Sequence, residues 1–230
     1  MTATDGPSAG RPQLICEEVF LLLTTDAGAR EGFGTQRGIG LTAAVIADLA
    51  ALGKVTADED KEHRVHVTDP VLTGDPVLDP ALARLVERDG DPFAQLVRDR
   101  KLDPEAAVGK RLAETGILGL QDARLGGLVP AKHPTLDPGP EQDLRARLRQ
   151  ALTGGPVTDR DLTILSILAG LGVHKTVLGP DLPELSARDL RDRIRELGAG
   201  SPAGQAVTSA IRTISLAVAS AGAMGAIASS

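Results

Sequence analysis

The stretch Leu162-Thr163-Ile164-Leu165-Ser166-Ile167-Leu168-Ala169-Gly170-Leu171 is the most apolar helical segment of the chain. Its large side chains, among them Ile164, Leu165 and Ile167, fall on all sides of a helix axis rather than on one face. A helix that is apolar all round has to be enclosed by other elements. We therefore expect this segment at the centre of a helical bundle.

The segments on either side have the patterns of the helices that would surround it. Leu41, Val45 and Leu49 recur at the spacing of one helical face, and Gly53 follows as a stop signal. Asp-Pro pairs at 79–80, 91–92 and 103–104 each predict the start of a helix of about ten residues, because Asp caps a helix and Pro suits its first turn. Further helices are expected over 14–23, 141–152, 185–197 and 203–227. A glycine cluster before the second helix is expected to be a flexible loop and comprises Gly32, Gly34, Gly38 and Gly40.

Two short hairpins interrupt the helical pattern. Lys54–Thr56 and Val65–Thr68 are β-rich and flank a polar tip, and residues 117–129 hold two apolar pieces around a polar centre. The predicted fold is all-α: a single helical domain with a central apolar helix ringed by amphipathic helices, plus two short β-hairpins. We expect the domain over residues 12–222, with flexible tails at 1–11 and 223–230.

Composition excludes several classes of protein. The chain of 230 residues has a formal net charge of −6, three Phe, and neither Tyr nor Trp. An acidic chain without stacking aromatics is a poor nucleic-acid binder, so no nucleic-acid partner is expected. Cys16 is the single cysteine, which rules out an internal disulfide. With no signal peptide at the start and no run of about 20 apolar residues, a cytoplasmic location is expected, at most peripheral on the cytoplasmic membrane face.

The sequence holds no pattern that assembles catalytic chemistry. Nucleophile elbows, phosphate-binding loops and zincin helices do not occur in it. His63 and His66 lie three apart beside acidic residues, but positions i and i+3 of a strand face opposite ways, which favours a solvated hairpin over a metal site. We expect neither an enzyme nor a bound metal or cofactor.

Basic residues gather at two places. Arg188, Arg191 and Arg195 share one helical face but alternate with acidic residues, which is typical of a solvated face with intrahelical ion pairs. The denser group flanks the 103–104 turn and comprises Arg98, Arg100, Lys101, Lys110 and Arg111. This group is either an anion or phospholipid headgroup site or an ordinary charged surface.

Several motifs in consistent order resemble the Golgi phosphoprotein 3-like (GPP34) family. Leu14-x-x-Glu17-Glu18-Val19-x-Leu21-Leu22-Leu23 is similar to the family's opening motif. The further matching blocks are Gly40-Leu41 with 44–55, Thr73-Gly74-Asp75 with Leu78-Asp79 and Ala81-Leu82, Gly116-Ile117-Leu118, and His133-Pro134. The excess of Arg over Lys, with abundant Ala, Gly, Asp and Pro, indicates a bacterial and specifically actinobacterial member.

The resemblance implies a single helical domain with a central apolar helix. Eukaryotic members of the family are peripheral Golgi proteins that bind phosphatidylinositol 4-phosphate through a basic pocket, press an apolar hairpin into the bilayer, and bind the cytosolic tails of glycosyltransferases.

Transferred to this chain, the family's pocket is only partly present. Phe33 stands where the pocket has an aromatic residue, whereas Thr42 replaces an arginine. Leu102 and Glu105 stand at two further arginine positions, although Arg100 and Lys101 are adjacent. The membrane-inserting hairpin would span Leu120–Val129, with the apolar side chains Leu120, Leu125, Leu128 and Val129.

Two functions follow as hypotheses. The first is a peripheral membrane-associated protein that binds an anionic, phosphoinositide-like headgroup beside the apolar hairpin. Its expected lipid-binding residues are Phe33, Arg37, Arg100, Lys101, Lys110 and Arg111. The second is a soluble adaptor or scaffold that binds a protein partner or a second copy of itself without lipid, for which the Ala- and Ser-rich segment 203–227 offers a close-packing helix.

Overall fold

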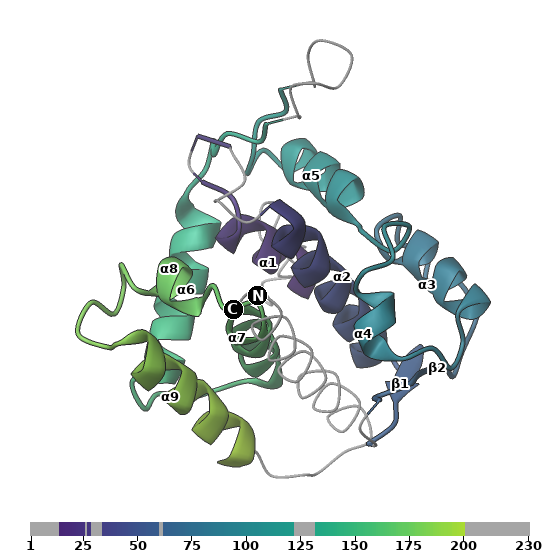
Figure 1. The fold of residues 1–230 in the computed structure, drawn as a ribbon. Coiled ribbons are helices and arrows are strands. Elements are labelled where there is room, and N and C mark those ends of the chain that lie inside the picture. Colours follow the sequence, from purple (N-terminus) through teal and green to yellow (C-terminus); the bar gives the residue numbers. More distant parts are fainter. Residues whose placement is uncertain (1–13, 26, 29–33, 60–61, 122–131, 201–230) are drawn as a thin grey trace, which may run out of the picture.

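The computed structural model is a helical bundle with one two-stranded sheet at its edge (Figure 1). It describes residues 14–25, 27–28, 34–59, 62–121 and 132–200. In chain order the elements are α1 (Ile15–Leu22), α2 (Gly34–Ala51), β1 (Val55–Ala57), β2 (Val65–Val67), α3 (Leu78–Glu87), α4 (Phe93–Leu96), α5 (Glu105–Glu114), α6 (Gly139–Leu152), α7 (Asp159–Gly170), α8 (His174–Leu178) and α9 (Ala187–Gly200). The predicted fold class is confirmed.

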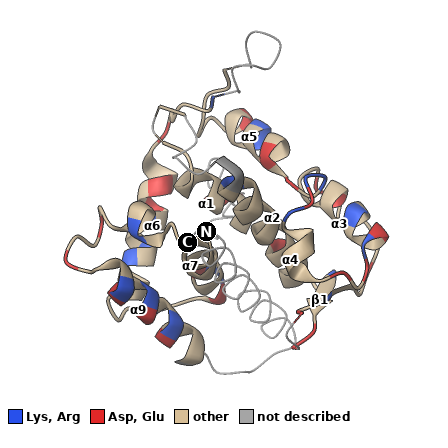
Figure 2. Cartoon of the chain, viewed as in Figure 1, with Lys and Arg blue, Asp and Glu red and all other residues tan. Residues whose placement is uncertain are grey.

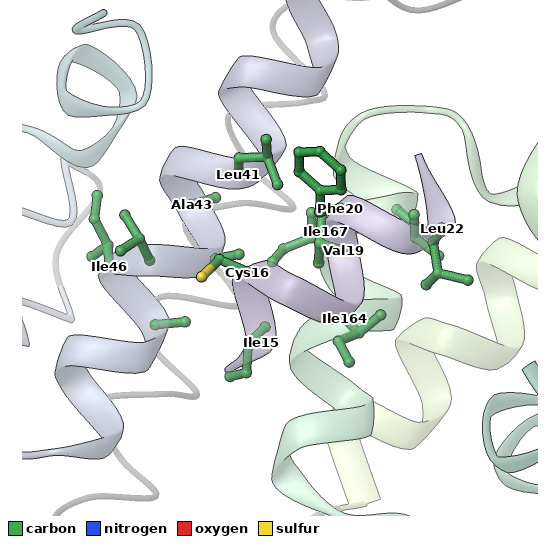
Figure 3. Close-up of a cluster of buried hydrophobic side chains, with 14 of the residues drawn as sticks. Ile15, Cys16, Val19, Phe20, Leu22, Leu41, Ala43, Ile46, Ile164 and Ile167 are labelled. Carbon is green, nitrogen blue, oxygen red and sulfur yellow. The ribbon is translucent and has the colours of Figure 1, made fainter. Parts of the chain in front are cut away.

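Two helices occupy the centre. In α7, the expected central helix, every residue from Asp161 to Leu168 is buried, and Thr158 caps its first turn by accepting a hydrogen bond from the Asp161 backbone N–H. In α1 all eight residues are buried, and this short helix contacts α2, α5, α6 and α7. Figure 3 shows apolar side chains of α1 packed between those of α2 and α7. The enclosed core is therefore built around α1 and α7 together.

Burying α1 completely requires partners for the polar groups at both of its ends. At its start, the Asp48 carboxylate of α2 accepts hydrogen bonds from the backbone N–H groups of Ile15 (2.7 Å) and Cys16 (3.0 Å). At its end, the Arg37 guanidinium donates to the Leu23 carbonyl at 3.0 Å. An anion at the N-terminus and a cation at the C-terminus are the charges that the helix dipole favours.

The two glutamates of α1 are also buried and also paired. Glu17 accepts from Arg111 of α5 at 3.1 Å. Glu18 accepts from Arg147 of α6 and, at 2.6 Å, from Arg160 of α7. Three neighbouring helices are thus attached to α1 by ion pairs as well as by apolar packing, and the fourth, α2, is attached by the hydrogen bonds to Asp48.

The glycine cluster before the second helix differs from expectation. From Gly34 onward it belongs to α2, not to a loop. A methyl group on Gly38 would lie 2.7 Å from a carboxylate oxygen of Asp103, and one on Gly40 would lie 2.8 Å from a methyl carbon of Leu171. Close packing against two neighbours therefore explains these glycines and outweighs their low helix propensity.

The helix starts predicted from the three Asp-Pro pairs agree with the structure to different degrees. The pair at 103–104 precedes α5, and Asp103 accepts from the Glu105 backbone N–H at 3.0 Å. The helix after the pair at 91–92 is wrong in length, since α4 has four residues instead of about ten. At α3, which begins at Leu78, the pair at 79–80 lies in the first turn; Asp75 accepts from the Val77 backbone N–H at 2.8 Å, and Asp79 accepts from the turn before the helix.

The first hairpin is confirmed: β1 and β2 are antiparallel, with Thr56 opposite His66. The second is present as two antiparallel bridges, Leu118 to Thr135 and Gln121 to Lys132. We call the paired segments 117–121 and 132–136 the arm. Its return segment lies later in the chain than the predicted 125–129, and those residues are outside the described part, as are the predicted tails and the helix at 203–227.

We predict that Asp48 makes the stability of the fold depend on pH. Burial raises the pKa of Asp48 from 3.8 to about 7, against the backbone hydrogen bonds from Cys16 and Ile15, which lower it. Between these values the folded chain holds a proton that the unfolded chain has lost, so the contribution of Asp48 to the unfolding free energy falls as pH rises from about 4 to 7 and is constant above.

The measurement is urea unfolding across this pH range. Asp48→Asn keeps an acceptor but cannot titrate, so the fall in stability between about pH 4 and 7 that Asp48 contributes is absent from this variant. Asp48→Ala leaves two buried N–H groups without this acceptor and lowers the unfolding free energy by about 2–4 kcal/mol. Equal pH slopes for the wild type and Asp48→Asn would contradict the assignment.

Candidate functional site

In the loop between α4 and α5, Asp99 and the basic side chains next to it point in opposite directions. Asp99 points inward with a side chain 11 % exposed, and its carboxylate accepts from Arg84 and Arg88, each at 2.9 Å. Partial burial acts to raise the pKa of Asp99, but hydrogen bonds from the Lys101 backbone and Arg84, together with both guanidinium charges, lower it overall. Asp99 therefore stays ionised and holds the loop against α3.

The cations next to Asp99 point outward. Arg98, Arg100 and Lys101 are exposed, and none of them has an ion-pair partner among the residues that the structure describes. Because Asp99 is bound by α3 and Asp103, the other carboxylate of the loop, accepts from the Glu105 backbone N–H, the loop presents three positive side chains that neither carboxylate pairs. Figure 2 shows this loop preceding α5.

Lys110 continues the exposed cations along α5. Its side chain is 73 % exposed and lies 3.7 Å from Glu114, one turn further along the helix. A solvated pair of this kind is weak, so Lys110 remains available to another anion.

Arg111, the next residue, has a structural role instead. It donates to Glu17 of α1 at 3.1 Å and to Asp75 before α3 at 2.5 Å. Burial acts to lower its pKa, but the hydrogen bond and charge of Asp75 and the charge of Glu17 raise it overall. The guanidinium thus ties three parts of the bundle together and has its charge balanced inside the protein.

Arg37 is enclosed even more completely, with a side chain 2 % exposed. Besides the Leu23 carbonyl, it lies 4.1 Å from the centre of the Phe20 ring and 3.4 Å from a carboxylate oxygen of Glu105. It belongs to α2, not to a loop before that helix as the sequence suggested. Phe33, the aromatic residue expected beside it, lies outside the described residues.

The positions at which the family resemblance implies arginines are occupied by internal residues. Thr42 and Leu102 are each 1 % exposed, and Glu105 faces Arg37. None of these three positions therefore supplies an exposed cation here. Of the six predicted headgroup residues, the structure places Arg100, Lys101 and Lys110 at the surface.

The arm begins where α5 ends. Ile117 and Leu118 are buried at its base, whereas Leu120 is 52 % exposed and Lys132 opposite Gln121 is exposed. Sequence reasoning missed Lys132, whose one signal was its place directly before the His133-Pro134 motif. The other predicted insertion residues, Leu125, Leu128 and Val129, lie outside the described part of the chain.

One helix connects the cations with the arm. The ten residues of α5 span about 15 Å, with Arg100 and Lys101 just before its start, Lys110 along its outer face and the arm after its end. In Figure 1 the arm projects from the bundle beyond α5. Positive and apolar groups thus follow each other along one edge of the molecule.

A hollow of about 410 Å³ lies at the foot of the arm and is lined by Thr135, Pro138, Glu141, Gln142 and Arg145. The Arg145 guanidinium donates to Glu141 at 2.8 Å and to Asp181 at 3.1 Å. Since both partners are carboxylates, this hollow offers no unbalanced positive charge to an anion.

Cys16 has no place in a site of this kind. Its thiol is buried at the α1–α2 contact, and burial together with the charge of Asp48 raises the pKa of Cys16 well above its usual value. A thiol that stays protonated and enclosed is inert packing.

The fold and the exposed edge define a class: an all-α domain whose surface presents cations beside a projecting β-arm. A family model described as Golgi phosphoprotein 3 (GPP34) matches residues 15–214, and the chain belongs to this family. No curated protein matches the chain. Within the described residues, helices long and apolar enough to cross a bilayer are absent.

We predict that neighbouring cations on α5 have opposite roles. Arg111→Met removes the guanidinium between Glu17 and Asp75 and leaves the buried Glu17 without this charge, which lowers the unfolding free energy by about 2–4 kcal/mol. Lys110→Met, one residue away on the exposed face, changes it by less than about 0.5 kcal/mol. Denaturant unfolding of both variants measures the difference, and similar losses would contradict the assigned roles.

Proposed function

We propose that this chain is a peripheral membrane protein that binds anionic phospholipid headgroups through Arg100, Lys101 and Lys110, while the arm brings Leu120 to the apolar boundary of the bilayer. The observation that carries the proposal is the set of exposed cations just before α5, which have no ion-pair partner among the described residues, on the helix whose other end carries the arm; Lys110 on α5 adds a cation held by a weak pair with Glu114. Membership of the GPP34 family supports it. The relevant surface would be a cytoplasmic leaflet, with no chemistry performed on the lipid.

Local charge favours this edge although the whole chain is acidic. Charges separated by more than about 8 Å are largely screened at physiological ionic strength, so the groups nearest the lipid decide the interaction. Within the loop, Asp103 accepts a hydrogen bond from the backbone N–H of Glu105, and Glu105 at the start of α5 faces the buried Arg37. These carboxylates are directed into the protein, whereas Arg98, Arg100 and Lys101 are exposed.

The expected binding needs both kinds of contact. Each Lys or Arg near an anionic surface contributes about 1 kcal/mol of binding free energy, so three such residues alone are too weak for stable attachment. Leu120 and the apolar residues of the hairpin would add a second contribution through shallow burial. We therefore propose reversible attachment that weakens when either contribution is removed.

A second candidate is a protein-binding adaptor, and one surface feature favours it. Val71 and Leu72 are 67 % and 57 % exposed, and Lys54 holds their loop in place by donating to the Val71 carbonyl at 2.7 Å and to Asp69. Leu52, 55 % exposed, precedes Lys54 at the end of α2. A fixed apolar surface of this kind is typical of a protein contact.

Co-sedimentation with phosphatidylcholine vesicles, with and without an added anionic phospholipid, tests the first proposal. We predict that the wild type sediments only with anionic vesicles and is released by salt. Arg100→Glu/Lys101→Glu/Lys110→Glu loses at least tenfold in affinity, because attraction becomes repulsion at the contact. Leu120→Asp is weakened as well.

The matched control is Arg188→Glu/Arg191→Glu/Arg195→Glu, which changes the net charge equally but on α9, at the other edge of the molecule in Figure 2. It retains binding if the α5 edge is the contact. Equal losses in both triple variants, or no salt-sensitive binding by the wild type, would overturn the membrane proposal. Lipid-independent self-association that Leu72→Ser abolishes would favour the adaptor.

A further inference from the structure

His133 is the outermost buried side chain of the arm's return segment. It is 8 % exposed, whereas its neighbour Lys132 is exposed. On the outgoing segment the corresponding boundary is Leu118, 1 % exposed, before the exposed Leu120. The arm therefore leaves the bundle between these two anchored residues.

Residues from three separate parts of the fold, Phe20, Gly28 and Gly109, enclose His133, and we call this enclosure its seat. The Phe20 ring of α1 meets the imidazole edge-on, with ring centres 5.3 Å apart and planes at 78°. Gly109 of α5 lies so close that a methyl group there would be 2.6 Å from Cε1 of His133. Gly28, which has a positive φ of 73°, accepts a hydrogen bond from the His133 backbone N–H at 3.2 Å.

Beyond this seat, the described backbone of the arm bonds mainly to itself. Gly119 donates to the Pro134 carbonyl at 2.7 Å, and Gln121 and Lys132 exchange hydrogen bonds of 2.9 and 3.0 Å. Ile117 and Leu118 donate to the Leu112 carbonyl at the end of α5. The outgoing segment is thus fixed by the helix end, and the return segment is fixed by His133.

We infer that His133 is a positioning residue that sets the direction of the arm relative to the exposed face of α5. The effect of this positioning on membrane binding rests on the proposed function, whereas the positioning of the arm by His133 does not. Gly109, which packs on the imidazole, directly precedes Lys110, so the seat joins the arm to the helix that presents the cations.

A fixed arm matters because two weak contacts have to reach one surface together. When both are held in the correct relative orientation, the second contact forms at a high effective concentration once the first has formed. An arm that pivots freely would spend most of its time in directions that do not place Leu120 and the α5 cations on the same plane.

The test uses two variants that disturb the seat from opposite sides and two matched controls. His133→Ala empties the seat, and Gly109→Ala forces the imidazole out of it. His174→Ala removes another buried histidine, 1 % exposed and bonded to the Ala187 carbonyl, and Gly40→Ala crowds Leu171 at another tight helix contact. Thermal unfolding, amide hydrogen exchange at Gly119, Gln121 and Lys132, and binding to anionic vesicles are measured for all four full-length variants.

We expect both seat variants to speed exchange at the arm amides at least tenfold and to weaken vesicle binding several-fold. The controls, with comparable losses in thermal midpoint, should leave arm exchange and vesicle binding near wild-type values. Unchanged arm exchange in folded His133→Ala and Gly109→Ala, or equal acceleration in the controls, would overturn the inference. Faster arm exchange with a wild type that binds no vesicles would support the seat and reject the membrane proposal separately.

Discussion

The fold depends on the complete burial of α1, a short helix that carries two glutamates and two ends with unpaired backbone groups. Burial without partners would cost several kcal/mol for each charge. Asp48 and Arg37 form hydrogen bonds with the backbone groups at the two ends of α1. The two glutamates form ion pairs with Arg111, Arg147 and Arg160. The arrangement of α2, α5, α6 and α7 around α1 follows as much from these charges as from apolar contact.

This internal pairing also decides which cations are left for the surface. Arg37 and Arg111 are both predicted from the sequence to bind lipid, yet both are balanced inside the bundle. Arg100 and Lys101 remain exposed without an ion-pair partner among the described residues because the adjacent Asp99 is bound by α3, and Lys110 is exposed in a weak pair with Glu114. A binding edge can thus exist on a chain with a net charge of −6, since the inward direction of particular carboxylates matters more than their number.

Periodicity and turn chemistry predicted the elements well where local physics decides. The enclosed helix α7, the first hairpin and the start of α5 all follow from apolar spacing, β-rich triplets and an Asp-Pro cap. Prediction failed at the start of α2 and at the length of α4, where distant contacts decide. Gly38 and Gly40 predict a loop from the sequence, but in the fold they pack closely against Asp103 and Leu171 within a helix. The helix α4 ends after four residues, where the chain turns and places Asp99 next to Arg84 and Arg88.

The sequence by itself determined the helical class, the segments that must be enclosed, the position of the first hairpin and the resemblance to the GPP34 family, because these depend on the order of residue types along the chain. Only the tertiary structure decided which charges are internal, that α1 shares the centre with α7, and that His133 holds the arm against α5. The physical reason is that the partner of a buried charge or ring is chosen by proximity in space. Glu18 and Arg160 are 142 residues apart in the chain and 2.6 Å apart in the fold.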